Sequence, residues 1–212
     1  MSGLSKEEVK EFIRQCASGL YYIHKQELAH LDIKPANIFR SFCETVAVEQ
    51  DFHEDFNNKT SVTYKIGDLG HVTQIGAKSY DDGDCRYMSR ELIDPKGQKR
   101  DIRKADIFAL GLSAYEAATL VDLPQNGPQW HHIRSEGVAK IKHVSDELNQ
   151  LIAGMIKENA SARPTAVQIA ESELISTYLS NKRLQQLLEE EVNKNKRLQR
   201  LVSKQCPIAK KC

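Results

Sequence analysis

The sequence contains no uninterrupted run of about 18 apolar residues, the least that a membrane-spanning helix needs. It also lacks any C-x-x-C spacing, and its five cysteines are odd in number and far apart. Such usage is typical of reduced thiols rather than of a disulfide framework or a zinc site. The first residues hold no apolar run, so we expect no secretory signal. These absences predict an intracellular protein with no membrane partner.

The chain has almost no net charge, because 30 lysine and arginine residues face 29 aspartate and glutamate residues, which gives +1 with neutral histidines. A protein dedicated to polyanions is normally strongly basic, so we expect no nucleic-acid partner. Hydrophobic residues make up 40% and charged residues 28% of the 212 positions, enough to build and solubilise a core. Composition predicts one globular domain, with or without an appendage.

Helical periodicity dominates the pattern of apolar residues. Ser5-Lys6-Glu7-Glu8 has the form of a capping box, which predicts a helix from there to about Gln26. The apolar spacing predicts further helices at 105–121, 148–156 and 166–175. Pro35 excludes a helix interior, so short extended arms are expected around it, and a short strand is expected at 64–66. The expected fold class is mainly α with short β-hairpins.

Two stretches differ from the rest of the chain. Residues 41–62 are acidic and turn-rich with little periodicity, which predicts an exposed insert. Residues 182–203 place leucine and valine within a half-circle and charged residues opposite, which predicts one long amphipathic helix of roughly 33 Å. We expect a domain at 1–179 and a helical tail at 180–212. The helix could equally pack on its own domain or contact a partner helix.

The strongest chemical signal is His30-x-Asp32-x-Lys34-Pro35-x-Asn37. Phosphoryl transfer to a hydroxyl group needs a carboxylate to orient it and accept its proton, a cation near the phosphate, and oxygen ligands for magnesium. Asp32, Lys34 and Asn37 supply these three. In isolation, His30 would be read as a core histidine and Asp32 as a turn residue.

This segment resembles the H-R-D-x-x-x-x-N catalytic loop of protein kinases, with Leu31 in place of the arginine. Downstream, in the correct order, Asp68-Leu69-Gly70 resembles the kinase D-F-G motif. The resemblance implies ATP and Mg²⁺ as cofactors, catalytic roles for Asp32 and Lys34, and metal ligation by Asn37 and Asp68. It implies that His30 supports the site and that Gly70 lets the backbone turn sharply.

Three further positions agree with the kinase pattern. The run 83–91 looks like the end of an activation segment spanning 68–91, with Glu91 in the place of the A-P-E glutamate. Arg163 matches the arginine that pairs with that glutamate, and Asp106 matches the aspartate that anchors the catalytic loop from a central helix. By the resemblance, these residues hold the site together rather than perform its chemistry.

Departures from the general pattern indicate a subfamily. Asp84 replaces the usual threonine of the substrate-reading loop, which also contains Arg86 and Tyr87, and Arg90 replaces the proline of A-P-E. These features, the acidic insert and the run 123–134 resemble the Wee family of kinases. That resemblance implies phosphorylation of a tyrosine in a cyclin-dependent kinase, restraint of mitotic entry, and a nuclear location, with the cytoplasm as the alternative.

The carboxylate of Asp84 suggests one physical hypothesis. Placed beside Lys34, it would hold the ammonium group in place of the missing threonine hydroxyl. The cleft would then be wider and would accept a tyrosine ring.

A Gly-rich G-x-G-x-x-G loop is absent, and nothing resembles V-A-I-K. In kinases these elements belong to the smaller lobe, which clamps the nucleotide. We therefore expect this chain to be the larger lobe alone and to transfer phosphate negligibly by itself. The alternative is a non-catalytic binding module that acts through the lobe surface and the C-terminal helix; a third possibility is that the smaller lobe is encoded upstream.

Overall fold

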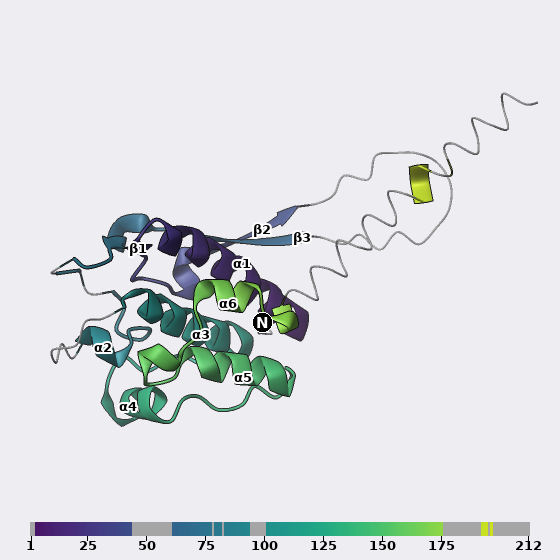
Figure 1. Cartoon of the computed structure of the whole chain (residues 1–212). Helices are drawn as coiled ribbons and strands as arrows, with labels where there is room; N and C mark the ends of the chain where they lie inside the picture. The colour runs from purple at the N-terminus through teal and green to yellow at the C-terminus, as the bar shows by residue number, and fades with distance from the viewer. Residues whose placement is uncertain are drawn as a thin grey trace, which may run out of the picture. The chain divides into compact units, whose positions relative to one another are not determined.

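The structure is a computed structural model, and it describes residues 3–43, 61–77, 79–81, 83–93, 101–175, 192–194 and 196. The chain divides into two units, 1–172 and 173–212, and the fold below is that of the first (Figure 1). The described part of the expected tail is too short to test the predicted helix at 182–203, most of which lies outside the described residues. Residues 44–60, which make up most of the insert expected at 41–62, also lie outside the described residues.

Helix α1 (Lys6–Lys25) begins as the sequence predicts. The Ser5 side chain accepts from the Glu8 backbone N–H, and the Glu8 carboxylate accepts from the Ser5 N–H, which completes the capping box. One face of α1 is buried, and its apolar members are Val9, Phe12, Ile13, Cys16, Ala17 and Leu20. Burial raises the pKa of the Cys16 thiol to about 12, so this cysteine is a packed, inert side chain.

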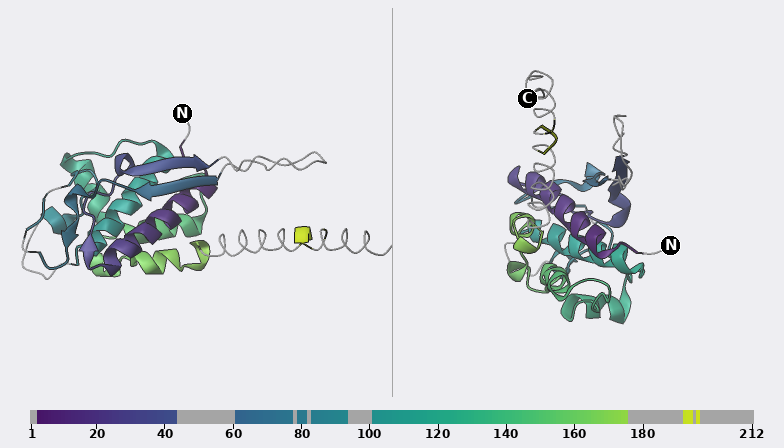
Figure 2. Two further views of the ribbon diagram at one scale, coloured as in Figure 1. Left: turned by 90° about the horizontal axis from the view of Figure 1, so that it is seen from above. Right: turned by 90° about the vertical axis from the view of Figure 1, so that its right-hand side faces the viewer.

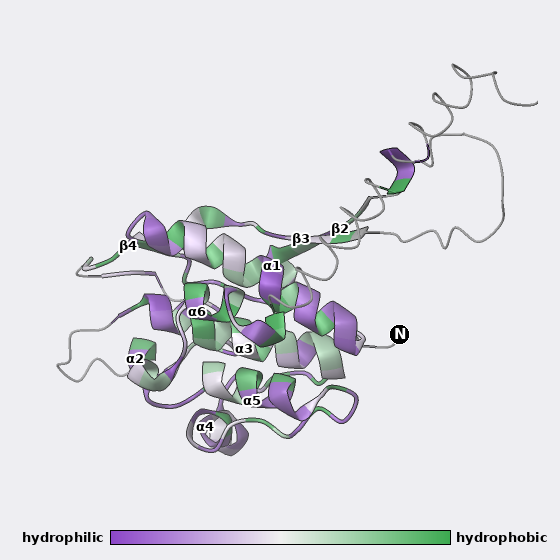
Figure 3. Ribbon diagram, turned by 45° about the vertical axis from the view of Figure 1, so that its right-hand side comes forward, coloured by the Kyte–Doolittle hydropathy of each residue, from purple (hydrophilic) through white to green (hydrophobic). Residues whose placement is uncertain are grey.

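Helix α3 (Arg103–Thr119) is the buried centre of the unit, and the helix predicted at 105–121 is confirmed. It packs against α1 and against α5 (Asp146–Met155), while α6 (Ala166–Ala170) also contacts α1 (Figures 1 and 2). Apolar residues run along most of α3, whereas α1 also carries a strongly hydrophilic surface (Figure 3). The approach of α5 is close, because a Cβ on Gly111 would lie 2.7 Å from Ile156.

Two small antiparallel sheets flank the helices. Strand β1 (Leu28–Ala29) pairs with β4 (Thr73–Gln74), and β2 (Ile38–Cys43) forms a hairpin with β3 (Ser61–Ile66). Gln15 of α1 fixes the hairpin, since its side chain accepts from the Tyr64 N–H at 2.7 Å and donates to the Val62 carbonyl at 3.0 Å. The hairpin therefore sits on α1, and its open end leads into the loops that follow Ile66.

Several boundaries differ from the sequence expectation. The stretch expected to be irregular from 41 to 62 is regular at both ends, because Cys43 pairs with Ser61 across the hairpin. The helix expected at 166–175 is interrupted: α6 ends at Ala170, the backbone turns at Glu171, and residues 173–175 are helical again. Helix α4 (Gly127–Ser135) was not among the helices that the apolar spacing predicted.

Short 3-10 turns complete the unit at Pro35–Asn37, Leu69–His71 and Ala160–Ala162, together with the four-residue helix α2 (Arg90–Ile93). An apolar cluster packs Leu92 of α2 against β1 and α3; its buried members are Ala29, Leu31, Met88, Leu92, Ile102 and Ala105. In the described part of the chain, no helix has the length and apolar character needed to cross a membrane.

Candidate active site

Asp106 anchors the loop that follows β1. This aspartate is fully buried on α3, and its two carboxylate oxygens accept the backbone N–H groups of His30 and Leu31, both at 2.8 Å. Its Oδ2 also contacts Nε2 of the buried His24 at 2.8 Å. Directly after these two N–H groups the backbone takes a positive φ of 63° at Leu31. Asp106 thus sets the starting point of the loop 30–37.

His30 connects this loop to the end of β3. Its Nδ1 accepts the Asp32 N–H at 3.3 Å, and its Nε2 lies 3.1 Å from the Gly67 carbonyl. A carbonyl only accepts, so Nε2 carries the proton and the ring is a neutral bridge. The side chain is fully buried. His30 therefore joins the loop 30–37 to the residue that follows β3.

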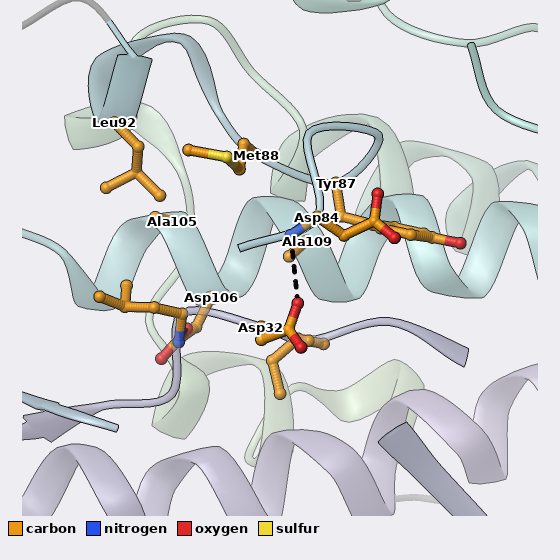
Figure 4. A pocket seen from close by; sticks show the side chains of 10 residues that line it. Asp32, Asp84, Tyr87, Met88, Leu92, Ala105, Asp106 and Ala109 are labelled. Carbon is orange, nitrogen blue, oxygen red and sulfur yellow. Dashed lines mark hydrogen bonds between the residues drawn. The ribbon is translucent and has the colours of Figure 1, made fainter. Parts of the chain in front are cut away.

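Asp32 is the centre of the polar cluster. Its side chain is 3% exposed, and its Oδ2 lies 2.9 Å from Lys34 Nζ and 2.7 Å from Asn37 Nδ2. Its Oδ1 accepts the backbone N–H of Asp84 at 3.2 Å (Figure 4). A cavity of about 10 Å³ lies between these loops and α3. The structure thus brings together Asp32, Lys34, Asn37 and the Asp84 backbone.

The β2–β3 hairpin brings the two expected magnesium ligands to one end. Ile38 lies opposite Ile66, and the Gly67 N–H donates to the Asn37 carbonyl at 2.9 Å, so Asp68 follows directly. Asn37 donates to Asp32 through Nδ2, which leaves its Oδ1 for a cation. Asp68 is exposed, and carboxylate and amide oxygens suit Mg²⁺. Within the described residues, Asp68 makes its hydrogen bond to Gly70 and none to the Asp32 cluster.

The sharp turn after β3 differs from the expectation. The left-handed residue is Asp68, with φ 56°, whereas Gly70 lies in the following 3-10 turn without a positive φ. Aspartate tolerates this conformation because its short side chain bonds locally, and here Oδ1 accepts the Gly70 N–H at 3.3 Å. The prediction that Gly70 makes the turn is therefore wrong.

The carboxylate of Asp84 pairs with Arg86 rather than with Lys34. Arg86 donates from Nε at 3.0 Å, from Nη2 at 2.7 Å and from its backbone N–H at 3.1 Å. These bonds, led by that of the Arg86 side chain, lower the pKa of Asp84. Arg86 is only two residues from Asp84, so the two side chains bond locally, while the Lys34 ammonium pairs with Asp32. The hypothesis that Asp84 holds the Lys34 ammonium is therefore wrong.

Gly83 allows the segment 83–91 to approach the loop 30–37 closely. A Cβ at this position would lie 2.4 Å from the Leu31 carbonyl oxygen, which is a backbone atom and cannot swing aside. We expect Gly83→Ala to force the two loops apart, lengthen the bond from Asp84 N–H to Asp32, and lower the free energy of unfolding by about 1–3 kcal/mol. Urea unfolding measures the loss.

Gly154 in α5 provides the matched control for Gly83. Nothing lies within 4 Å of a Cβ built there, so Gly154→Ala should raise stability by up to about 1 kcal/mol through helix propensity. If both alanine variants shifted the urea midpoint in the same direction, the close approach at Gly83 would not be the cause.

Glu91 and Arg163 form a two-pronged ion pair. Arg163 Nη1 lies 2.5 Å from Oε1, and Nη2 lies 3.0 Å from Oε2. The arginine side chain is 1% exposed and also donates to the carbonyls of Lys157, Lys104 and Glu158. This arginine therefore ties Glu91 of α2 to Lys104 at the start of α3.

Trp130 and Arg134 of α4 belong to the run 123–134 that carries the Wee resemblance, but no role in the site was predicted for them from the sequence. Arg134 is 1% exposed, and its guanidinium donates to the carbonyls of Cys85, Arg86, Met88 and Trp130 at 2.9–3.1 Å. It stacks on the Trp130 ring at 3.5 Å, and Trp130 Nε1 donates to the same Cys85 carbonyl at 2.8 Å. Burial lowers the pKa of Arg134 to about 9. The available signal was the four-residue spacing of the two side chains, which places them on one helical face.

Tyr87 occupies the other side of the same turn. Its ring is 5% exposed, and its hydroxyl donates to the Glu116 carboxylate of α3. Burial and this bond to a carboxylate raise the pKa of Tyr87. Of the three expected substrate-loop residues, Tyr87 is therefore buried, and Asp84 and Arg86 are bonded to each other.

Comparison with known proteins agrees with this geometry. The protein kinase domain family matches residues 1–175. The chain is 35% identical to a Wee1-like protein kinase of Drosophila melanogaster over 208 residues, and 37% identical to Wee1-like protein kinase 2 of Homo sapiens over 200. It is 37% identical to Wee1-like protein kinase 1-B of Xenopus laevis over 210 residues. These alignments cover 91%, 91% and 96% of the chain, and 34%, 35% and 35% of the relatives. The chain thus spans about a third of the length of these relatives.

Proposed function

The chain belongs to the protein kinase family, where its relatives are Wee1-like kinases, and from that membership we propose that it supplies the catalytic loop for ATP-dependent phosphorylation of a tyrosine. The observation that carries this proposal is the buried Asp32 carboxylate with Lys34, Asn37 and the Asp84 N–H around it. A buried, oriented carboxylate next to a fixed cation suits transfer of a phosphoryl group to a hydroxyl.

Each residue of the cluster takes one part of the reaction. Asp32 orients the acceptor hydroxyl and accepts its hydrogen bond, while the Asp84 N–H and Asn37 Nδ2 hold the carboxylate in place. Lys34 balances the charge of Asp32 and lies beside the expected path of the phosphate. Asn37 Oδ1 and the Asp68 carboxylate would hold Mg²⁺. Magnesium–ATP, when bound, supplies the transferred γ-phosphoryl group.

The acceptor and the cellular role follow from the relatives' name. Proteins named Wee1-like kinases match across most of the chain, which supports a tyrosine of a cyclin-dependent kinase as the acceptor. Restraint of mitotic entry and a nuclear location, with the cytoplasm as the alternative, belong to the same proposal. These properties are proposed for the whole protein, and the chain spans about a third of the length of its relatives.

A non-catalytic binding role is favoured by a different observation. Phe39 and Leu69, 61% and 64% exposed, are large apolar side chains near the same end of the β2–β3 hairpin, with the Phe39 ring against Gly67. Exposed apolar surface of this kind suits a covering partner. The same surface would also suit a planar ring such as adenine. An assay of phosphoryl transfer therefore distinguishes the binding role from the catalytic role.

We expect the 212-residue chain alone to transfer phosphate negligibly, because its sequence has no Gly-rich loop and no lysine in a V-A-I-K context. Joined to the smaller lobe of a Wee1-like relative, it should phosphorylate a tyrosine peptide. Asp32→Asn should then lower kcat by about 10²–10⁴, since the amide cannot accept the hydroxyl proton. Transfer of radiolabelled phosphate to tyrosine and serine peptides measures both.

The control is Asp122→Asn, an exposed aspartate that precedes α4, which should leave kcat unchanged. Robust transfer by the chain alone would contradict the expected need for the smaller lobe. A joined protein whose tyrosine transfer is unaffected by Asp32→Asn would contradict the proposed catalytic role.

A further inference from the structure

The turn 84–88 has a strong asymmetry in its backbone hydrogen bonds. The N–H groups of Tyr87 and Met88 both donate to the Asp84 carbonyl, at 2.9 and 3.2 Å, which closes the turn on one side. The carbonyls of Cys85, Arg86 and Met88 all bond to donors from α4. The bond to the Met88 carbonyl is buried and those to the Cys85 and Arg86 carbonyls are partly buried. Carbonyls shielded from water are costly without a donor, so the turn depends on α4 for its conformation.

Arg134 supplies several of these donors from a single side chain. Its planar guanidinium donates to three carbonyls of the turn and to the Trp130 carbonyl, and its face stacks on the Trp130 ring. Within the described residues, no carboxylate lies within ion-pair distance of it. Its charge is therefore balanced by carbonyl dipoles, and the group acts as a fixed donor plate instead of one half of an ion pair.

We propose that Trp130 and Arg134 form a latch on α4 that positions the turn 84–88 against Asp32, so that Arg134 is a positioning residue of the acceptor side of the site. The link runs through Asp84, whose N–H donates to Asp32 Oδ1 at 3.2 Å while its carbonyl closes the turn. The reading of this turn as acceptor-facing rests on the proposed function. The effect of the latch on the local order of the turn can be measured by hydrogen exchange, without phosphoryl transfer.

The experiment uses the 212-residue chain and Arg134→Lys. An ammonium group donates from one point and cannot reach the same carbonyls, so the turn should open locally. We expect hydrogen exchange at the amides of Asp84, Tyr87 and Met88 to accelerate about 10-fold or more, as for the loss of a local structural unit. The amides of His30 and Leu31, bound to Asp106, should exchange as in the parent chain.

Trp130 provides an independent signal, because it is the chain's single tryptophan. Loss of the stacked guanidinium should expose its ring, which is 7% exposed in the parent chain, and increase quenching of its fluorescence by acrylamide. Trp130→Phe keeps an aromatic face but loses the bond to the Cys85 carbonyl, so it should accelerate the same amides by a smaller factor. This second variant also serves if Arg134→Lys fails to fold.

Arg90→Lys is the matched control, because Arg90 is exposed and pairs with Glu158 at the surface. It should alter neither signal. Equal acceleration at the His30 and Leu31 amides would show that Arg134 only stabilises the whole fold, and unchanged exchange at the turn would show that there is no latch; either result overturns the proposal. Failure of tyrosine transfer in the joined protein would contradict the proposed function and leave these exchange rates unaffected.

Discussion

Arg163→Met is expected to lower the free energy of unfolding by about 3–5 kcal/mol, as for the loss of one partner of a buried ion pair. Methionine fills much of the space of the arginine stem, yet it leaves Glu91 and the carbonyls of Lys157, Lys104 and Glu158 without their donor. The Phe108 ring also loses the guanidinium that lies 4.8 Å from its centroid. Urea unfolding followed by circular dichroism measures the change.

Arg90→Met is the control for this prediction. Arg90 pairs with Glu158 at the surface, where the two side chains are 44% and 49% exposed, so its loss should cost no more than about 1 kcal/mol. Glu91→Gln should fall between the two, because the amide keeps the shape but loses the charge and one acceptor. Equal urea midpoints for Arg163→Met and Arg90→Met would contradict the importance of burial at Arg163.

Local signals explain why parts of the fold were predictable. The capping box at Ser5 and the apolar periodicity of α3 are written within a few residues of the elements they specify, and the structure confirms both. The ends of the β2–β3 hairpin are different, because the pairing of Cys43 with Ser61 joins residues far apart in the chain. No local pattern reports a distant partner for such short segments, so the ends of the hairpin were predicted to be irregular.

In the candidate site, the sequence likewise predicted which residues lie close together but not which of them bond to each other. The fixed spacing of the motif predicted the residues of the loop 30–37. The spacing does not show which cation pairs with the Asp84 carboxylate, because both Arg86 and Lys34 are candidates. In the structure, Asp84 bonds to Arg86, which is two residues away, while Lys34 pairs with Asp32. The burial of Arg134 was not predicted for another reason: arginine is rarely fully buried unless it is paired, so the residue type favours an exposed side chain.

Asp106→Asn is expected to combine a loss of stability of about 3–5 kcal/mol with disorder of the candidate site. The carboxylate accepts from His30 N–H and Leu31 N–H and contacts His24, and bonds to a charged acceptor contribute about 1.5–3 kcal/mol each. An amide places an NH₂ group where one oxygen stood. Whichever way it is oriented, one backbone N–H of the loop then faces a donor inside a fully buried site.

The measurements are urea unfolding and hydrogen exchange at the His30 and Leu31 amides, which should exchange faster because their shared acceptor is gone. Asp146→Asn is the control, since that carboxylate pairs with Lys140 at the surface with 69% and 62% of the side chains exposed, and it should cost less than about 1 kcal/mol. His24→Leu removes one of the three contacts and should give an intermediate loss, which keeps the test decisive if Asp106→Asn does not fold. Equal unfolding midpoints for Asp106→Asn and Asp146→Asn would mean that the loop 30–37 is held by packing alone, because the buried carboxylate would then contribute no more than an exposed one.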